Sequence, residues 1–141
     1  RAGRPSPGPP WATPAAVATI NAMEREGMVQ HAASLGTDVI GPALAGFAER
    51  HQSVGEVRGR GVFWAIELVK DRATREPLAP YGSSSTEMNQ LVAACKSRGL
   101  IPFANFNRIH VVPPCNISVE DALTGLAILD EVLDIADTYA A

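Results

Sequence analysis

The chain has 141 residues, of which 46% are apolar and 19% charged, a composition typical of one globular domain. Its net charge of −3, with acids and bases interspersed, offers no basic face to nucleic acid or to an anionic membrane, and no run of about twenty apolar residues is present to span a bilayer. Cys95 and Cys115 are the two cysteines and lack metal-type spacing, so we expect reduced thiols in a cytoplasmic protein.

The first fourteen residues predict an extended arm, because five are proline and two are glycine. We therefore expect an arm over 1–14 and a compact domain over 15–141. The chain begins at Arg1 without a methionine or an apolar leader, so we also expect it to be part of a longer polypeptide. Arg4, Pro7 and Pro10 match a spacing that proline-recognising domains bind, which leaves an interaction role for the arm open.

Two helical patterns follow the arm. Apolar positions predict a helix from residue 15 that ends at Gly27, where glycine suits a left-handed helix end. A second pattern runs over 28–48, and Gly36 and Pro42 are the positions at which it can bend or divide.

The segments 54–58 and 62–69 predict a hairpin of two strands, the second more deeply buried than the first. Between them lies the corner Gly59-Arg60-Gly61. Glycine reaches positive φ without a clash, so this corner can turn sharply or bring its backbone close to a neighbouring segment. A plain hairpin is favoured over a phosphate loop, since no helix pattern starts directly after it.

The remaining elements begin with a polar loop over 70–83. A third helix is predicted from Ser84, capped by its hydroxyl and by Glu87 three residues later, to Gly99. Two short strands follow at 101–104 and 108–112, and Pro113-Pro114 ends the second, because proline cannot donate to a sheet.

Ser118 and Asp121 open the last helix, which an apolar stripe extends to Ala136. This order of elements predicts an α+β fold, a small mostly antiparallel sheet with helices packed on one face.

Two motifs resemble one enzyme family. Residues 54–68 read Val-Gly-Glu-Val-Arg-Gly-Arg-Gly-Val-Phe-Trp-Ala-Ile-Glu-Leu, and residues 108–118 read Arg-Ile-His-Val-Val-Pro-Pro-Cys-Asn-Ile-Ser. Together they are similar to a hairpin and a strand in the C-terminal domain of class III pyridoxal-phosphate-dependent aminotransferases, which are fold-type I enzymes. The resemblance implies a homodimer that transfers an amino group from an amino acid or an ω-amine to a 2-oxo acid.

The resemblance also implies a cofactor that this chain does not hold by itself. Pyridoxal phosphate needs a lysine for its aldimine, and in the family that lysine lies upstream of the matched part. The two lysines here, Lys70 and Lys96, have the pattern of surface charges. Pro5 stands where the family has a phosphate-binding threonine and offers neither hydroxyl nor amide hydrogen. We expect no catalytic residue, no cofactor binding by the chain alone, and therefore no activity in isolation.

The substrate-binding strand departs from the family pattern. Many members have a carboxylate-binding arginine where this chain has His110, which is only partly charged at neutral pH. Arg108 shares its face of the strand, because side chains alternate with a period of two. Arg108 and His110 are therefore our candidate substrate-binding residues, although a locally paired structural histidine is an equal reading. His31 and His51 are predicted on helix surfaces and indicate no metal site.

Two alternatives to a transaminase domain stay open at this point. One is a stand-alone binding or regulatory α+β module with a ligand at the Gly59-Arg60-Gly61 corner. The other is an interaction protein that docks through its proline-rich arm.

Overall fold

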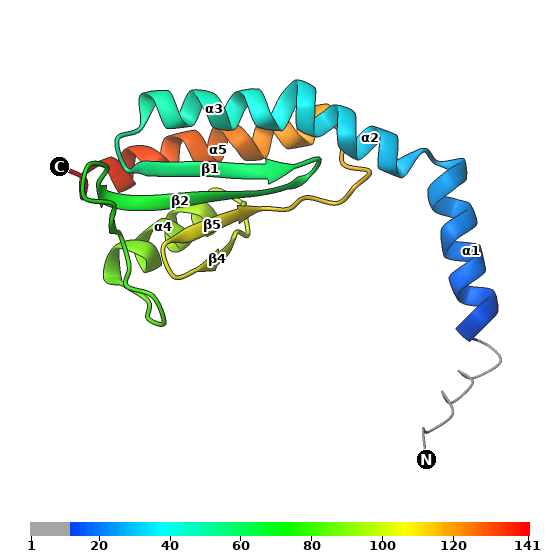
Figure 1. Ribbon diagram of the computed structural model, residues 1–141, viewed down its shortest axis with the longest axis horizontal. Helices are drawn as coiled ribbons and strands as arrows, with labels where there is room; N and C mark the ends of the chain where they lie inside the picture. The colour runs from blue at the N-terminus through cyan, green and yellow to red at the C-terminus, as the bar shows by residue number, and fades with distance from the viewer. Residues whose placement is uncertain (1–11) are drawn as a thin grey trace, which may run out of the picture.

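The computed structural model describes residues 12–141. Its elements in chain order are α1 (Ala12–Arg25), α2 (Met28–Leu35), the π-helical segment η1 (Gly36–Ile40), α3 (Gly41–Arg50), β1 (Val54–Arg60), β2 (Phe63–Asp71), β3 (Glu76–Pro77), α4 (Thr86–Ser97), β4 (Phe103–Asn105), β5 (Arg108–Val111) and α5 (Val119–Asp137). Figure 1 shows α3, α4 and α5 against one side of the sheet. The expected α+β class is confirmed.

The sheet has the strand order β1-β2-β5-β4, and every strand pair in the described chain is antiparallel. Its register sets Val57, Ile66, Ile109 and Ala104 in one row across the four strands. That row faces the helices and belongs to the core, so the neighbouring row must face the other way. We call that second side the open face.

The core forms where this row meets the helices. Its fully buried members include Ile66, Leu68 and Ile109 from the strands, and Leu44, Leu91 and Leu133 from the helices. Burying one such side chain contributes about 1.5–3 kcal/mol relative to leaving it in water, so the covered side of the sheet supplies most of the apolar stabilisation. The side chains of the open face therefore do not have to be apolar.

A backbone contact seats the helices on the hairpin. A Cβ at Gly36 would lie 2.1 Å from the carbonyl oxygen of Gly61, so only glycine fits. Gly61 has φ 58° and opens the two-residue loop between β1 and β2, where glycine takes this conformation without strain. The indole nitrogen of Trp64 donates to the same carbonyl at 2.6 Å, and Gly59 leaves space for that ring. Both uses expected of the glycine corner, turning and close approach, are confirmed.

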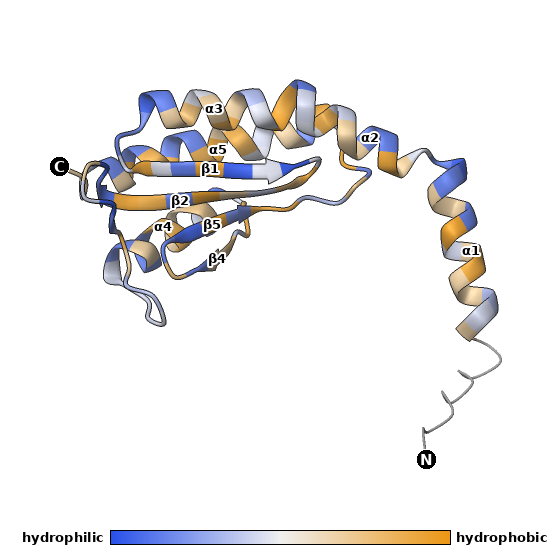
Figure 2. Cartoon of the chain, in the orientation of Figure 1, coloured by the Kyte–Doolittle hydropathy of each residue, from blue (hydrophilic) through white to orange (hydrophobic). Residues whose placement is uncertain are grey.

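The helix boundaries confirm some expectations and correct others. The first helix begins at Ala12, three residues earlier than expected, and Gly27 after it has φ 60°. The long second helix is divided at Gly36 by the π-helical segment. Figure 2 shows apolar residues along α1, although none of its side chains is buried.

The capping box expected at Ser84 is wrong by one residue. Ser85 is the cap, its hydroxyl accepts from the amide of Met88, and Glu87 therefore lies one position too early to complete the box. The expected loop over 70–83 contains the short strand β3, which pairs with β2. At the last helix the Ser118 cap is confirmed, because its hydroxyl accepts from the amide of Asp121 at 3.0 Å. No helix within residues 12–141 is long and apolar enough to cross a membrane.

The Gly36 contact makes a testable prediction. Gly36→Ala should lower the free energy of unfolding by about 2–3 kcal/mol, because the new methyl group meets backbone that cannot move without displacing the hairpin. Urea unfolding followed by circular dichroism measures this.

Gly125→Ala is the matched control. Its Cβ would meet only the side chain of Leu100, at an ordinary 3.7 Å, and alanine favours the helix, so stability should stay equal or rise by up to about 1 kcal/mol. Equal stability of both variants would contradict the backbone contact.

Candidate functional site

The open face carries most of the charged and aromatic side chains of the sheet. The register places charged, aromatic and small residues from all four strands on this side, and these are Glu56, Arg58, Phe63, Ala65, Glu67, Phe103, Arg108 and His110. The row nearest its centre runs Arg58, Ala65, His110 and Phe103. Both candidate residues from the sequence, Arg108 and His110, therefore lie on this face, at adjacent positions of β5 on the same side.

Arg108 has a guanidinium group that no acid neutralises. Its cross-strand partner is Glu67, yet within residues 12–141 no carboxylate oxygen lies within 4.0 Å of its nitrogens. The guanidinium carbon lies 5.9 Å from the ring centroid of Phe106, a cation–π distance that holds the side chain near the sheet. Arg108 is therefore a half-buried positive charge available to an anion.

A neighbouring ion-pair network accounts for the other charges. Arg58 Nη1 lies 3.2 Å from Glu56 and 3.3 Å from Glu67, and Arg75 adds a contact of 2.9 Å to Glu56. The hydrogen bonds from Arg75 and Arg58 lower the pKa of Glu56. Because Arg58 is held by Glu67, that acid is not free to neutralise Arg108.

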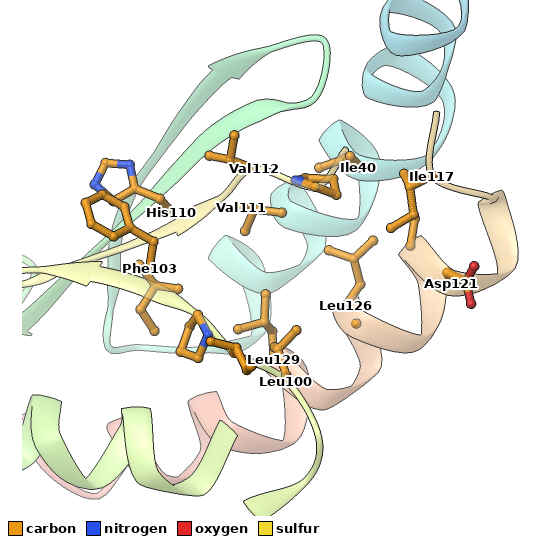
Figure 3. A pocket seen from close by; sticks show the side chains of 16 residues that line it. Ile40, Leu100, Phe103, His110, Val111, Val112, Ile117, Asp121, Leu126 and Leu129 are labelled. Atoms are coloured by element: carbon orange, nitrogen blue, oxygen red, sulfur yellow. The ribbon is translucent and has the colours of Figure 1, made fainter. Parts of the chain in front are cut away.

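His110 lies between two aromatic rings. Its ring centroid is 4.9 Å from that of Phe103 and 6.5 Å from that of Phe63, and Figure 3 shows it beside Phe103. Its Nε2 is buried and has no hydrogen-bond partner within the described chain. Burial, followed by the positive charges of Arg108 and Arg58, lowers the pKa of His110. The ring is therefore neutral at neutral pH.

An apolar cavity of about 230 Å³ lies behind β4 and β5, against α5. Its wall is mostly aliphatic, with Ile40, Val111 and Leu126 toward the middle and Asp121 at the rim opposite His110 (Figure 3). Asp121 is occupied as the partner of the Ser118 hydroxyl, at 2.7 Å. Among residues 12–141, the titratable side chains that line the cavity are His110 and Asp121 at opposite ends, so its wall offers no cluster of polar groups for reaction chemistry.

The two lysines do not fit a carbonyl cofactor. Lys70 Nζ lies 3.4 Å from Glu87 with its side chain 37% exposed, and Lys96 is exposed on α4. A Schiff-base lysine has to be kept from water and close to the cofactor ring. Neither lysine has such surroundings within residues 12–141, and Pro5, where the phosphate contact was sought, lies outside the described residues.

His51 corrects the surface position expected for it. It is 5% exposed, with Nδ1 2.8 Å from Asp137 and Nε2 2.9 Å from Asp130. Burial opposes the charged ring, but hydrogen bonds to Asp130 and Asp137 outweigh it, and the pKa of His51 is raised. The ring therefore joins the loop before β1 to the end of α5 as an imidazolium.

The same cluster has the composition of a metal site. One ligand atom each of His51, Asp134 and Asp137 lies within 4.8 Å of the others. Both ring nitrogens face carboxylates, which favours the doubly protonated ring, and in that form the ring has no lone pair for a metal. His31, which lies in α2, is half-buried with Nε2 2.9 Å from the carbonyl oxygen of Ile117.

A family model described as aminotransferase class-III matches residues 6–133. The chain belongs to the class III aminotransferase family. It is 37% identical over 121 residues to an uncharacterized aminotransferase, YhxA, of Bacillus subtilis, covering 81% of this chain and 25% of that protein. It is 35% identical over 112 residues to the taurine–pyruvate aminotransferase of Bilophila wadsworthia, covering 75% of this chain and 23% of that protein.

Solved structures agree with this membership. The taurine:2-oxoglutarate aminotransferase of Bifidobacterium kashiwanohense, solved with PLP and glutamate, matches with a TM-score of 0.81 and 32% identity over 86% of this chain and 27% of that one. A PLP-bound amine transaminase from an uncultivated Pseudomonas species matches with a TM-score of 0.77 and 28% identity, over 85% of this chain and 26% of that one. The chain thus spans about a quarter of the length of these relatives.

Some site residues were missed from the sequence. Phe63 and Phe103 wall His110 from two different strands, and only the register of the sheet brings them there. The His51 cluster left a weak signal, because Asp130, Asp134 and Asp137 follow one another at helical spacing on a single face of α5.

The environment of His110 predicts the effect of removing one wall. Phe103→Ala should raise the pKa of His110 toward its ordinary value, because water reaches the ring and stabilises its charged form. Proton NMR of the imidazole against pH measures this. Ile101→Ala, which truncates a side chain 84% exposed just before β4, should leave the titration unchanged. An unmoved midpoint in both variants would show that Phe103 does not shield the ring.

The His51 cluster predicts how stability depends on pH. Because the folded pKa of His51 is raised, its contribution is complete below the unfolded value of about 6.5 and is lost as pH rises through the folded pKa. The lowered pKa values of Asp130 and Asp137 mean that their contribution is lost in acid, below about pH 4. Urea unfolding should therefore show greatest stability between these limits.

Variants separate this cluster from other titrating groups. His51→Gln should cost about 2–3 kcal/mol near pH 6 and flatten the decline above about pH 6.5, because a neutral amide replaces the charged ring. Asp134→Asn is the matched control, since that side chain is 79% exposed and 3.8 Å from the ring, and it should change little. A decline that persists in His51→Gln would assign the pH dependence elsewhere.

Proposed function

We propose that residues 15–141 form the C-terminal small domain of a pyridoxal-phosphate-dependent transaminase, which moves an amino group from an amino acid or an ω-amine to a 2-oxo acid. Family membership and the match to a structure solved with PLP and glutamate support this reading. The observation that carries it is the unneutralised guanidinium of Arg108 beside His110 on an otherwise uncovered sheet face.

The open face has the chemistry to bind the acid group of a substrate. Arg108 offers a planar donor pair to a carboxylate or sulfonate, and the network of Arg58, Glu56 and Glu67 holds competing acids away from it. Phe63 and Phe103 exclude water beside His110, which strengthens hydrogen bonds made there. In this proposal the domain positions the substrate, and the reacting groups come from elsewhere.

Residues outside this chain would complete the enzyme. Pyridoxal phosphate supplies the electron sink for amino transfer when a lysine anchors it, and Lys70 and Lys96 are both unsuited to that role. We infer that the chain alone does not catalyse the reaction. The complete enzyme is proposed to be a homodimer, as the sequence resemblance implies, and a cytoplasmic protein, as the lack of metal-type or disulfide-type cysteine spacing suggests.

The names of the relatives suggest the class of donor. Those from Bilophila wadsworthia and Bifidobacterium kashiwanohense are named for taurine, an amine whose acid group is a sulfonate. A short donor of this kind, with its acid group apart from its amine, suits a domain that binds acids at Arg108.

A chimaera tests this function. The 141 residues would replace the matching quarter of the Bilophila wadsworthia taurine–pyruvate aminotransferase, and alanine formed from taurine and pyruvate would be measured. We expect measurable transamination. In the chimaera, Arg108→Gln should raise the KM for taurine about 10- to 100-fold with a smaller effect on kcat, because a charge-assisted hydrogen bond to the acid group is lost.

Arg98→Gln serves as the control. Arg98 pairs with the exposed Glu131 on the helical side of the domain, so kinetic constants should stay close to those of the chimaera. A folded chimaera without activity, or an equal effect of both substitutions, would contradict the proposed role of the open face.

A further inference from the structure

We propose that His110 takes up a proton when the open face binds an acid group, so that this face binds acids more tightly as the pH falls. The inference rests on the proposed function, because it concerns the same face. It adds a property that an arginine at this position would not have, since arginine is charged at every physiological pH.

The first support is an unsatisfied atom. His110 Nε2 is buried against Phe103 and Phe63, and no group of residues 12–141 accepts from it or donates to it. Buried polar atoms are nearly always hydrogen-bonded, and an exception points to a partner that arrives from elsewhere. Phe103 flanks the ring within its row, so we place the partner on the open side of the sheet, where Arg108 lies on the same face of the strand.

The second support is the arrangement of charges around the ring. β1 contributes Arg58, β5 contributes Arg108 and β2 contributes Glu67, whereas β4 contributes the uncharged Phe103. Glu67 is held by Arg58 at 3.3 Å, so the positive charge of Arg108 is the least compensated of the three. This field and burial keep the empty site neutral, in agreement with the lowered pKa of His110.

An acid group changes that balance. Bound at Arg108, its negative charge cancels the repulsion between the guanidinium and a protonated ring, and its second oxygen can accept a hydrogen bond from an Nε2–H. The charged form of His110 is then favoured. By linkage, a ligand that raises the pKa of a group binds more tightly in the pH range where the proton is taken up.

This coupling has a consequence for selectivity. Above the range of proton uptake, Arg108 is the charged donor beside His110 that no acid of the described chain pairs, and the face binds an acid group weakly. Within that range the ligand gains a second charged donor, and affinity rises by up to tenfold for each pH unit. The face is therefore a proton-dependent acid site, and a mildly acid pH favours substrate loading.

NMR of the 141-residue chain tests this with sodium acetate as the probe. The His110 resonance would be titrated in acetate and in sodium chloride of equal ionic strength, and acetate affinity would be measured from about pH 5.5 to about pH 7.5. We expect the His110 midpoint to rise by about half a unit or more in acetate, and affinity to increase about 5-fold or more at the lower pH. His31, bonded to the carbonyl of Ile117, reports general salt effects in the same spectra.

Two variants separate the possible outcomes. His110→Gln should bind acetate weakly at every pH, and His110→Arg should bind it with a pH-independent affinity near the best value of the wild type. If acetate binds to the wild type while the His110 midpoint stays unmoved, proton uptake is refuted and the acid-binding face survives. If neither the wild type nor His110→Arg binds acetate, the acid-binding role itself fails, and this inference fails with it.

Discussion

The contact between Gly36 and Gly61 determines how the two layers of the fold meet. A helix and a hairpin tip approach until a Cβ on the first would overlap the backbone carbonyl of the second, a separation that no other residue permits. The indole of Trp64 reaches the same carbonyl and thereby ties the hairpin to the contact. Since side chains alternate along a strand, fixing which side of β2 meets the helices also fixes which side stays open.

The two faces of the sheet differ in composition because of that constraint. The row of Ile66 and Ile109 is buried and carries the packing energy, so the opposite row can hold charge without destabilising a core. Charged and aromatic side chains, among them Arg108, Phe63 and Phe103, occupy this opposite face of the sheet. Phe63 and Phe103 are more than 60% exposed, which is unusual for phenylalanine and consistent with a surface that binds something.

The sequence predicts features whose cause is local. The Ser118 cap needs only the amide three residues on, and Gly27 and Gly99 need only their own positive φ. Ser85 was missed because Ser84 is chemically equivalent and one residue earlier, so residue type alone could not choose between them. The short β3 was missed for a related reason, since a two-residue strand has no period to detect.

Features that depend on strand register or on distant segments were harder to predict from the sequence. That Arg108 and His110 share a face follows from one strand alone, and it could be predicted. That Phe63 and Phe103 flank His110 requires the pairing of three strands, which the order of residues does not specify. His51 was wrongly predicted on a surface, because the two carboxylates that hydrogen-bond to its ring lie about eighty residues further along the chain.

The contrast between His51 and His110 shows why residue type is a weak guide to charge. His51 is buried and His110 is half-buried, and this loss of water by itself disfavours the charged form in each case. At His51 a carboxylate faces each ring nitrogen, and two hydrogen bonds outweigh burial, so the charged ring is favoured and holds two segments together. At His110 the near charges are guanidinium groups and Nε2 has no partner, so burial and repulsion act in the same direction. A histidine that is already charged and paired can only stabilise the fold, whereas a neutral one beside a cation can still respond to an arriving anion. Of these two rings, it is therefore His110, on the open face, whose charge a ligand can change.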